Sequence, residues 1–467
     1  MKRCKPHYVW LTAALLLSNL GASLNRQSSP DFGAVEKVAI EELRLLNTPG
    51  AAIGIVSGDR LVYVKGVGIS DVETGAPLSP EMLFRLGSTT KMFTATALVS
   101  LSEEGKIKLD DPIGRIVKGL DPKIAAVTAH QLMTHTSGFL DEAPMYGSQD
   151  ESALAREVQS WKGDRFFTTP GDVYSYSNPG YWLAGYLVES LGGKLYADVM
   201  NERVFAPLGM TRTTLRPTMA MTYPLAQGHD TGAGGKPAVV HPAANNAASW
   251  PAGSIFSNVE DLSRFVIAFV NGGKIDGKQV LSPRVIEKLS TPYVDIPGSQ
   301  GAQYGYGLEI SNERGVHTLK HGGSRSGYGS LIWMVPEHRF GVIILANRTG
   351  VSLNKTAEKA MEILLPLKPP TQAEVEKELI FSDKDKSELP GTYFHPPAQR
   401  VEIVLKDDKL FLRRGSTDLP LRKIGTDRIS AAAEGAARGQ QYVIVRGKDG
   451  KSLYLHSGGR ALKKTQQ

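Results

Sequence analysis

Ser88-Thr-Thr-Lys91, Tyr176-Ser-Asn178 and His321-Gly-Gly323 are the stretches of sequence that decide the fold, because they follow one another in this order. An S-x-x-K pattern alone is weak evidence, and a second one stands at Ser352-Leu-Asn-Lys355. Tyr-x-Asn occurs only at Tyr176, whereas H-x-G occurs at His321 and again at His456. Only Ser88 precedes both other motifs, so it is the candidate nucleophile of a serine hydrolase. We interpret Ser352 as an ordinary residue before a helix and His456 as part of a turn.

The first two motifs contain the groups that nucleophilic catalysis needs. Residues three positions apart on a helix face the same side, so Ser88 and Lys91 are expected to bring a hydroxyl and an amine together. A serine hydroxyl is a weak nucleophile until a base removes its proton. Lys91 can act as that base only if its pKa falls well below the ordinary value of about 10.4. Tyr176 offers a phenol that can relay the proton to the leaving group. The sequence leaves open which of the two is the base.

Other residues of the motifs are predicted to bind the substrate. The backbone N–H of Ser88, at a helix start, and the N–H of Ser324 are expected to stabilise an oxyanion. Gly322 and Gly323 are expected to let the substrate lie close against their strand. The Asn178 amide can hold a substrate carbonyl group or the lysine amine.

The length of 467 residues predicts a large domain and a smaller one. We assign residues 1–23 to a signal peptide, because a basic start precedes a largely apolar run and small residues. The only cysteine, Cys4, lies in this segment, so the mature chain has no disulfide. The formal net charge of +7 falls to +4 without Lys2, Arg3 and Lys5, which is too weak to indicate a nucleic-acid partner. We therefore expect a secreted or periplasmic protein with no stable membrane span after signal removal.

Hydrophobic periodicity divides the mature chain into three parts. Residues 33–367 form the predicted hydrolase domain, in which an early helix and hairpin and late strands at 316–321, 330–335 and 341–347 suggest an α/β sandwich closed by its two ends. A helix is predicted over 255–270, a helical and loop region before it, and a terminal helix around 353–364. Residues 368–387 are predicted to be a linker. Residues 388–467 are predicted to form a small barrel-like β domain, with strands at 401–405, 409–413, 442–446 and 452–456.

On these motifs, the chain resembles the serine β-lactamase and penicillin-binding protein superfamily, on the class C branch. That branch includes D,D-carboxypeptidases, D-aminopeptidases and family VIII esterases. Residues 130–138, which read HQLMTHTSG, and the run 321–347 add to the likeness, which covers roughly residues 35–365. The resemblance implies an antiparallel sheet with a helical subdomain, and it implies catalytic roles for Ser88, Lys91 and Tyr176.

His321 departs from the β-lactamase pattern, in which a lysine supplies a fixed positive charge for the substrate carboxylate. A histidine is only partly charged near neutral pH, so the sequence favours a peptidase, amidase or esterase over a dedicated β-lactamase. If the imidazole holds a carboxylate, binding is expected to weaken as the pH rises through about 6.5.

The sequence therefore predicts an exported serine hydrolase that forms an acyl-enzyme on Ser88. Its expected substrates are small molecules or peptides that contain D-amino acids, including amides, related β-lactams and material derived from the cell wall. The alternatives are a promiscuous carboxylesterase and a non-catalytic receptor for penicillins or peptides. No cofactor or metal is predicted, because His130 and His135 have no third ligand at zinc-site spacing.

Overall fold

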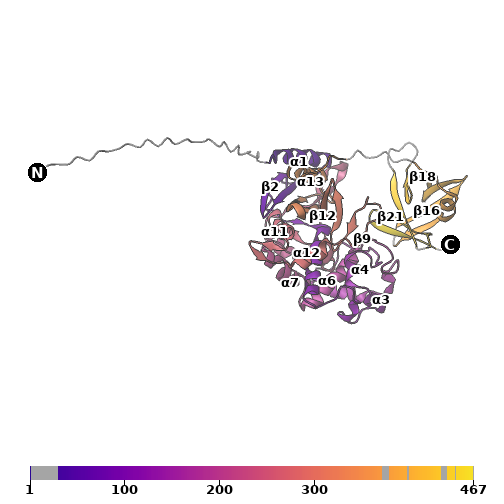
Figure 1. The fold of residues 1–467 in the computed structure, drawn as a ribbon, viewed down its shortest axis with the longest axis horizontal. Coiled ribbons are helices and arrows are strands. Elements are labelled where there is room, and N and C mark those ends of the chain that lie inside the picture. The colour runs from indigo at the N-terminus through magenta and orange to yellow at the C-terminus, as the bar shows by residue number, and fades with distance from the viewer. Residues whose placement is uncertain (2–29, 371–377, 397–398, 433–438, 448, 466–467) are drawn as a thin grey trace.

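The structure is a computed structural model that describes residues 1, 30–370, 378–396, 399–432, 439–447 and 449–465 (Figure 1). The predicted signal segment lies outside the described residues apart from Met1. Within the described part of the chain, no helix is long and apolar enough to cross a membrane.

One antiparallel sheet of eight strands, in the order β2-β1-β14-β13-β12-β11-β10-β9, organises the first part of the chain. Its strands are β1 Gly50–Ser57, β2 Arg60–Gly68, β9 Val294–Asp295, β10 Gln303–Tyr304, β11 Glu309–Glu313, β12 Val316–Arg325, β13 Tyr328–Val335 and β14 Phe340–Ala346. Strand β1 pairs with β14, so that Ile53 lies opposite Ile344. The two ends of this region therefore meet in one sheet, as the sequence predicts.

Helices cover both faces of this sheet, which explains why β13 and β14 are buried along their whole length. Helices α1 Gly33–Leu45 and α13 Asn354–Leu364 lie side by side on one face (Figure 1). The Glu42 carboxylate joins them, because it accepts hydrogen bonds from the backbone N–H groups of Lys355 and Thr356 at 3.0 and 2.9 Å. This capping satisfies N–H groups that a helix start leaves without partners.

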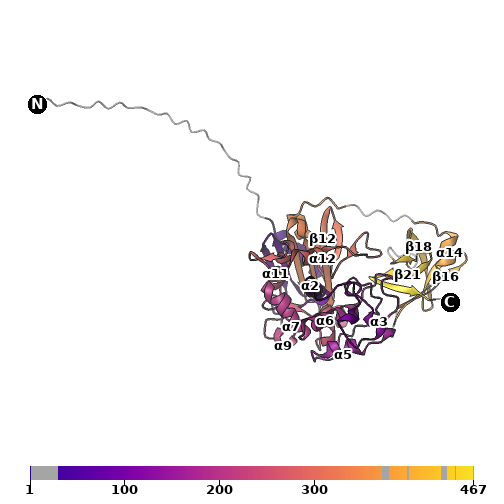
Figure 2. The same ribbon diagram turned by 60° about the horizontal axis from the view of Figure 1, so that its bottom comes forward.

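The opposite face of the sheet packs against the helical region (Figure 2). Its helices are α2 Thr90–Glu103, α3 Pro122–Ala125, α4 Ala129–Met133, α5 Ala153–Ser160, α6 Asn178–Gly192, α7 Tyr196–Met200, α8 Ala206–Leu208, α9 Pro217–Ala220, α10 Trp250–Gly253, α11 Val259–Val270 and α12 Pro283–Ser290. Helix α11 begins later than predicted, because Phe256 and Ser257 form a short strand, β6, that pairs with β3 Phe84–Arg85. The Asn258 side chain then caps the helix by accepting a hydrogen bond from the Asp261 N–H at 2.9 Å.

The second part of the chain is a closed β barrel, as predicted, but it contains strands that the periodicity missed. Its strands are β15 Gly391–His395, β16 Gln399–Lys406, β17 Lys409–Arg414, β18 Thr417–Gly425, β19 Arg428–Ala431, β20 Gln440–Arg446, β21 Ser452–Ser457 and β22 Arg460–Lys464. Strands β18 and β22 carry many charged residues and little apolar alternation, so pairing with neighbouring strands determines their conformation.

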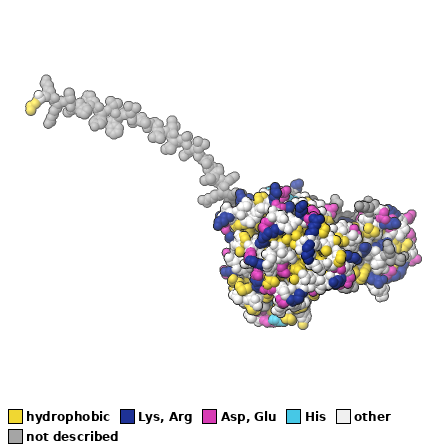
Figure 3. All heavy atoms as spheres, turned by 90° about the horizontal axis from the view of Figure 1, so that it is seen from below, with side chains coloured by type: hydrophobic (Ala, Val, Ile, Leu, Met, Phe, Trp, Pro, Cys, Tyr) yellow, Lys and Arg dark blue, Asp and Glu magenta, His cyan; other side chains and the backbone are white. Residues whose placement is uncertain are grey.

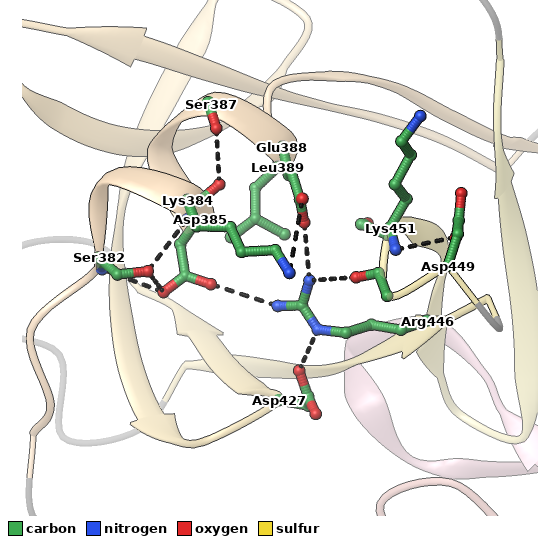
Figure 4. Close-up of polar contacts among 12 residues, drawn as sticks. Ser382, Lys384, Asp385, Ser387, Glu388, Leu389, Asp427, Arg446, Asp449 and Lys451 are labelled. Atoms are coloured by element: carbon green, nitrogen blue, oxygen red, sulfur yellow. Dashed lines mark hydrogen bonds and ion pairs between the residues drawn. The ribbon is translucent and has the colours of Figure 1, made fainter.

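Part of the predicted linker is ordered structure that packs on the barrel. Residues 371–377 lie outside the described residues, but helix α14 Asp383–Glu388 follows, capped by Ser382. Asp385 of this helix forms ion pairs with Lys423 at 2.6 Å and with Arg446 at 3.2 Å. Arg446 also pairs with Asp427 of the barrel at 2.7 Å (Figure 4). The helix is therefore tied to the barrel by buried and half-buried charges.

The barrel contacts the helical region through hydrogen bonds and through a small apolar cluster. Val173 packs there against Tyr454 and Ala461 of the barrel, with Phe167 and Val445 at the edge of the cluster. Basic and acidic side chains are interspersed across the face shown in Figure 3, with no surface of a single sign.

Candidate active site

Ser88 lies where β12 approaches the start of α2. It belongs to a short 3-10 turn, Gly87–Thr89, that leads into the helix. Gly87 has φ +57°, and a Cβ atom there would lie 2.6 Å from the backbone nitrogen of Ser324. A Cβ atom on Gly323 would lie 1.9 Å from the Leu86 carbonyl oxygen. These glycines are therefore required for the close approach of the two backbones beside Ser88.

Lys91 is fully buried one turn after Ser88. Its Nζ donates hydrogen bonds to Ser88 Oγ at 3.3 Å, to Asn178 Oδ1 at 2.8 Å and to the Ala252 carbonyl oxygen at 2.8 Å. Burial lowers the pKa of Lys91 to about 7, against an opposing effect of Asp141 and a smaller supporting effect of Arg460. A substantial fraction of this lysine is therefore neutral near pH 7, as a general base requires.

Asn178 is oriented by a chain of polar contacts that ends in the barrel. Asp141 Oδ1 accepts hydrogen bonds from the Asn178 backbone N–H at 2.7 Å and from its Nδ2 at 3.0 Å. The amide oxygen of Asn178 must then face Lys91. The other carboxylate oxygen of Asp141 accepts a hydrogen bond from Nε of Arg460, in β22, at 2.8 Å. Arg460 thus connects the barrel to Lys91 through Asp141 and Asn178.

Tyr176 lies two residues before helix α6 and faces Ser88 and Lys91. Nζ of Lys91 is 4.8 Å from the centroid of the Tyr176 ring, and the centroids of the Tyr176 and His135 rings are 4.1 Å apart. Burial raises the pKa of Tyr176 well above its ordinary value, against a smaller opposing effect of its hydrogen bond with Ser88. Tyr176 is therefore a neutral phenol that can donate a proton. Its backbone N–H donates to the carbonyl oxygen of Gly459, in the β21–β22 turn, at 2.9 Å.

A directional chain of hydrogen bonds links the second motif to the third. The Ser177 N–H donates to Nδ1 of His135 at 3.1 Å, which leaves the His135 proton on Nε2, 3.3 Å from the Tyr304 hydroxyl. The Tyr304 hydroxyl can then donate to Nε2 of His321 at 2.9 Å. Nδ1 of His321 donates to the Gly322 carbonyl oxygen at 2.6 Å. Each ring therefore has one defined neutral tautomer in this chain.

His321 does not supply the positive charge that the sequence analysis considered. Burial, with a smaller effect of the Lys91 charge, lowers the pKa of His321 to about 3, so the imidazole is neutral at physiological pH. With a neutral imidazole, we expect no loss of carboxylate binding near pH 6.5. Desolvation is not visible in a motif, and the partner Tyr304 lies at no recognisable spacing from it.

Four of the predicted substrate-binding residues, 321–324, lie together near the end of β12, whereas Asn178 begins helix α6. Ser324 lies in β12 opposite Gly329 of β13. Gly322 has free space beside it, since the atoms nearest to a Cβ at this position would be 3.9 Å away. Gly323 has none, because a Cβ there would lie 1.9 Å from the Leu86 carbonyl oxygen. Gly322 thus has the space that the predicted approach of a substrate needs, while Gly323 allows the approach of β12 to the start of α2.

Two cavities open on either side of Ser88. One has a volume of about 200 Å³ and is lined by Asn178, Trp182, Ser249 and Arg325 among others. The second has a volume of about 330 Å³ and is lined by Tyr176, His321, Gly322 and Arg460 among others. Both include Ser88 and Ser324 in their walls. A group bonded to Ser88 can therefore extend in two directions.

The alternative motifs have other surroundings. Ser352 also lines the second cavity, and the backbone N–H of Lys355 donates a hydrogen bond to the Glu42 carboxylate at 3.0 Å. His130 contacts the Tyr306 hydroxyl at 2.9 Å, and His135 belongs to the chain described above. Among the described residues, no three His, Cys, Asp or Glu side chains are grouped to hold a metal ion.

Sequence reasoning did not assign Asp141, Tyr304 or Arg460 to the site. Asp141 and Tyr304 stand alone in their segments, with no motif around them. Arg460 lies more than 280 residues beyond Tyr176 in sequence and reaches the site only because the barrel packs there. Contacts of this kind arise from tertiary packing, which spacing does not encode.

A half-buried serine next to a buried lysine, beside a tyrosine and an antiparallel sheet, is the arrangement of serine hydrolases related to penicillin-binding proteins. The family model described as Beta-lactamase matches residues 39–365, so the chain belongs to the β-lactamase family. The resemblance inferred from the motifs is confirmed.

Individual relatives cover most of the chain. Penicillin-binding protein 4 of Amycolatopsis lactamdurans is 27% identical over 329 residues, which cover 68% of this chain and 85% of that protein. Protein flp of Staphylococcus aureus (strain N315) is 25% identical over 332 residues, which cover 69% of this chain and 64%, less than two thirds, of the relative.

Solved structures agree on the fold. The octameric penicillin-binding protein homologue from Pyrococcus abyssi is 27% identical with a TM-score of 0.65, covering 93% of this chain and 100% of that one. The D-alanine carboxypeptidase AmpC from Burkholderia cenocepacia is 26% identical with a TM-score of 0.59, covering 71% of this chain and 99% of that one.

Proposed function

We propose that this protein is an exported serine hydrolase that forms an acyl-enzyme on Ser88. The observation that carries the proposal is the buried Lys91, whose Nζ lies 3.3 Å from Ser88 Oγ and whose pKa burial lowers to about 7. A surface lysine in a chance S-x-x-K pattern has neither property.

In the proposed acylation step, neutral Lys91 accepts the proton of Ser88 Oγ as the oxygen attacks the substrate carbonyl carbon. The N–H groups of Ser88 and Ser324 stabilise the oxyanion that forms. The Tyr176 hydroxyl then protonates the departing amine or alcohol and regains a proton from Lys91. Tyr176 is the acid in this scheme, because the raised pKa of its phenol disfavours the phenolate. Water, activated by the same groups, releases the acyl group.

The two cavities then have different roles. Tyr176 lines the second cavity, so that cavity receives the leaving group, and the first cavity receives the acyl group. We propose peptides and amides that contain D-amino acids, with related β-lactams, as substrates. The similarity to a D-alanine carboxypeptidase and to a penicillin-binding protein supports this choice.

A promiscuous carboxylesterase is the second candidate. The neutral His321 favours it, because the imidazole supplies no positive charge for a substrate carboxylate in the leaving-group cavity, and Arg460, which also lines that cavity, is paired with Asp141. Export to the periplasm or the medium remains part of the proposal, and it rests on the pattern of residues 1–23.

Covalent labelling tests the nucleophile. We expect a fluorophosphonate or a β-lactam probe to label the parent protein and Ser352→Ala but not Ser88→Ala, with the labelled peptide containing Ser88. Labelling that persists in Ser88→Ala would show that another residue reacts. Release of the acyl group from a labelled β-lactam or ester distinguishes a hydrolase from a receptor, because a receptor retains the label.

A further inference from the structure

Two arginines, Arg85 and Arg325, are buried next to the acyl cavity. Their exposed fractions are 3% and 7%. In the part of the chain that the structure describes, neither guanidinium forms an ion pair with a carboxylate; two nitrogens of Arg85 and Nε of Arg325 have no hydrogen-bond partner. A buried charge without an opposite charge is unfavourable, so an arrangement of two such charges needs an explanation.

Arg85 belongs to the interior of the protein. It donates a hydrogen bond to the Ala244 carbonyl oxygen, and its guanidinium lies 5.0 Å from the centroid of the Phe256 ring. It does not line the acyl cavity. Its charge nevertheless acts on Arg325, since it lowers the pKa of that arginine.

Arg325 faces the acyl cavity and is held only weakly. Its terminal nitrogens lie 3.4 Å from the Ser249 hydroxyl and 3.4 Å from the Met145 carbonyl oxygen, and its Nε has no partner. A strong N–H···O bond is shorter, at about 2.9–3.0 Å. Both partner residues line the same cavity, which locates the guanidinium in its wall.

The position of Arg325 in sequence places it beside the reacting centre. It follows Ser324, whose N–H is one of the proposed oxyanion donors, in strand β12. The acyl cavity, of about 200 Å³, is smaller than the about 300–1,000 Å³ usual for a whole ligand. It therefore suits one substituent of the acyl group.

We propose that Arg325 forms an anion subsite in the acyl cavity, which selects substrates whose acyl group carries a carboxylate. The inference deepens the proposed function and rests on it. A planar carboxylate can accept two parallel hydrogen bonds from a guanidinium. It would also supply the negative charge that neither Arg325 nor Arg85 finds in the protein.

The burial of Arg325 and the nearby Arg85 lower the pKa of Arg325 to about 9. The Tyr146 hydroxyl has a smaller opposite effect. The guanidinium remains positively charged at neutral pH, so the subsite keeps its charge where the hydrolase works.

A matched pair of 4-nitrophenyl esters tests the subsite. The half-ester of adipic acid ends in a carboxylate, and the 6-methylheptanoate ester ends in an uncharged isopropyl group of similar size at the same chain length. We expect kcat/KM for the parent protein to favour the adipate half-ester by about ten- to hundredfold. Arg325→Gln should reduce this ratio to near one, and Arg325→Lys should retain part of it. Arg115→Gln, a change in an exposed ion pair with Asp111, is the control and should keep the parent's ratio.

Thermal unfolding distinguishes a binding role from a structural one, because replacing an arginine that only stabilises the fold would lower the unfolding temperature. Because an unpaired buried charge destabilises the fold, Arg325→Met is expected to unfold at the same or a higher temperature than the parent while losing the preference. A second measurement needs no variant, since adipate itself should inhibit hydrolysis of the neutral ester competitively.

The outcomes separate the two proposals. A ratio near one in the parent, or a preference that survives in Arg325→Gln, overturns the anion subsite while leaving the hydrolase intact. A lower unfolding temperature for Arg325→Met together with an unchanged ratio assigns Arg325 a structural role. Absence of both ester hydrolysis and fluorophosphonate labelling overturns the proposed function, and the subsite with it.

Discussion

Lys91 is the residue whose surroundings set the pH range of the proposed reaction. Its three hydrogen-bond acceptors leave it no contact with water, and burial is the largest cause of its lowered pKa. The same acceptors keep the amine pointed at Ser88. Position and protonation state are thus controlled by one set of contacts.

The rate of acylation should therefore rise with pH. Only neutral Lys91 can accept the serine proton, so log(kcat/KM) is expected to increase with unit slope below pH 7 and to level off above it, because the pKa is about 7. Lys91→Arg should lose about a hundredfold or more of kcat/KM, since arginine stays protonated. A profile that is flat between pH 5.5 and 8.5 would contradict the role of Lys91 as base.

His321 is expected to contribute no titration to substrate binding. Its pKa of about 3 keeps the imidazole neutral throughout the range from pH 5 to 8. The KM values of a carboxylated substrate and of a matched neutral one should therefore change in parallel with pH, in the parent and in His321→Gln. A KM that rises near pH 6.5 for the carboxylated substrate alone would show that His321 is charged when the substrate binds.

At the scale of elements, the β21–β22 hairpin is the unexpected component of the site. Its turn contributes the Gly459 carbonyl oxygen to the Tyr176 N–H and the Arg460 guanidinium to Asp141. Asp141 and Arg460 act on Lys91 in opposite directions, because the carboxylate raises the pKa of the lysine and the guanidinium lowers it. The hairpin is therefore in a position to tune the base without contacting it.

Substitutions in this chain should shift the pH profile in opposite directions. Arg460→Gln is expected to raise the pKa of Lys91 and move the rising limb of kcat/KM to higher pH, whereas Asp141→Asn is expected to move it to lower pH. Both variants should also lower the value at which kcat/KM levels off at high pH, because Asn178 is less firmly oriented in them. The control is Arg422→Gln, which removes an exposed ion pair with Glu378 elsewhere on the barrel. Shifts of the same sign in Arg460→Gln and Asp141→Asn would refute this electrostatic account.

The sequence predicts elements best where one strong local pattern defines them. Strands β13 and β14 and helix α13 lie close to their predicted bounds, because apolar runs and an amphipathic face specify them. Strand β22 was missed, because its alternation is obscured by lysines and by Arg460. For the site, the motifs supplied Ser88, Lys91 and Tyr176, but not the burial that shifts their pKa values or the partners Asp141 and Tyr304.

At the scale of the whole molecule, the hydrolase region and the barrel have separate apolar cores and contact each other beside the active site. The barrel has its own apolar core, which includes Tyr393 and Tyr442, and the sheet closes through pairing of β1 with β14 without any barrel residue. The shared cluster around Val173 is small by comparison. The barrel thus adds little to the packing of the hydrolase core, but its residues Gly459 and Arg460 contact Tyr176 and Asp141 at the proposed active site.

Removal of the barrel should therefore impair catalysis more than folding. A chain that ends at Pro370 keeps every strand of the eight-stranded sheet and both helices on its outer face. We expect it to fold, to be labelled at Ser88, and to show a lower kcat/KM with the rising limb displaced to higher pH, as in Arg460→Gln, because Asp141 loses its partner. The second cavity also loses the wall formed by Gly458, Gly459 and Arg460, so preference among leaving groups should broaden.

Circular dichroism measures folding, covalent labelling measures the reactivity of Ser88, and the pH profile of kcat/KM measures the effect on Lys91. A truncated chain that cannot fold would show that the barrel belongs to the main core, and one with the parent's pH profile would show that the hairpin does not act on Lys91.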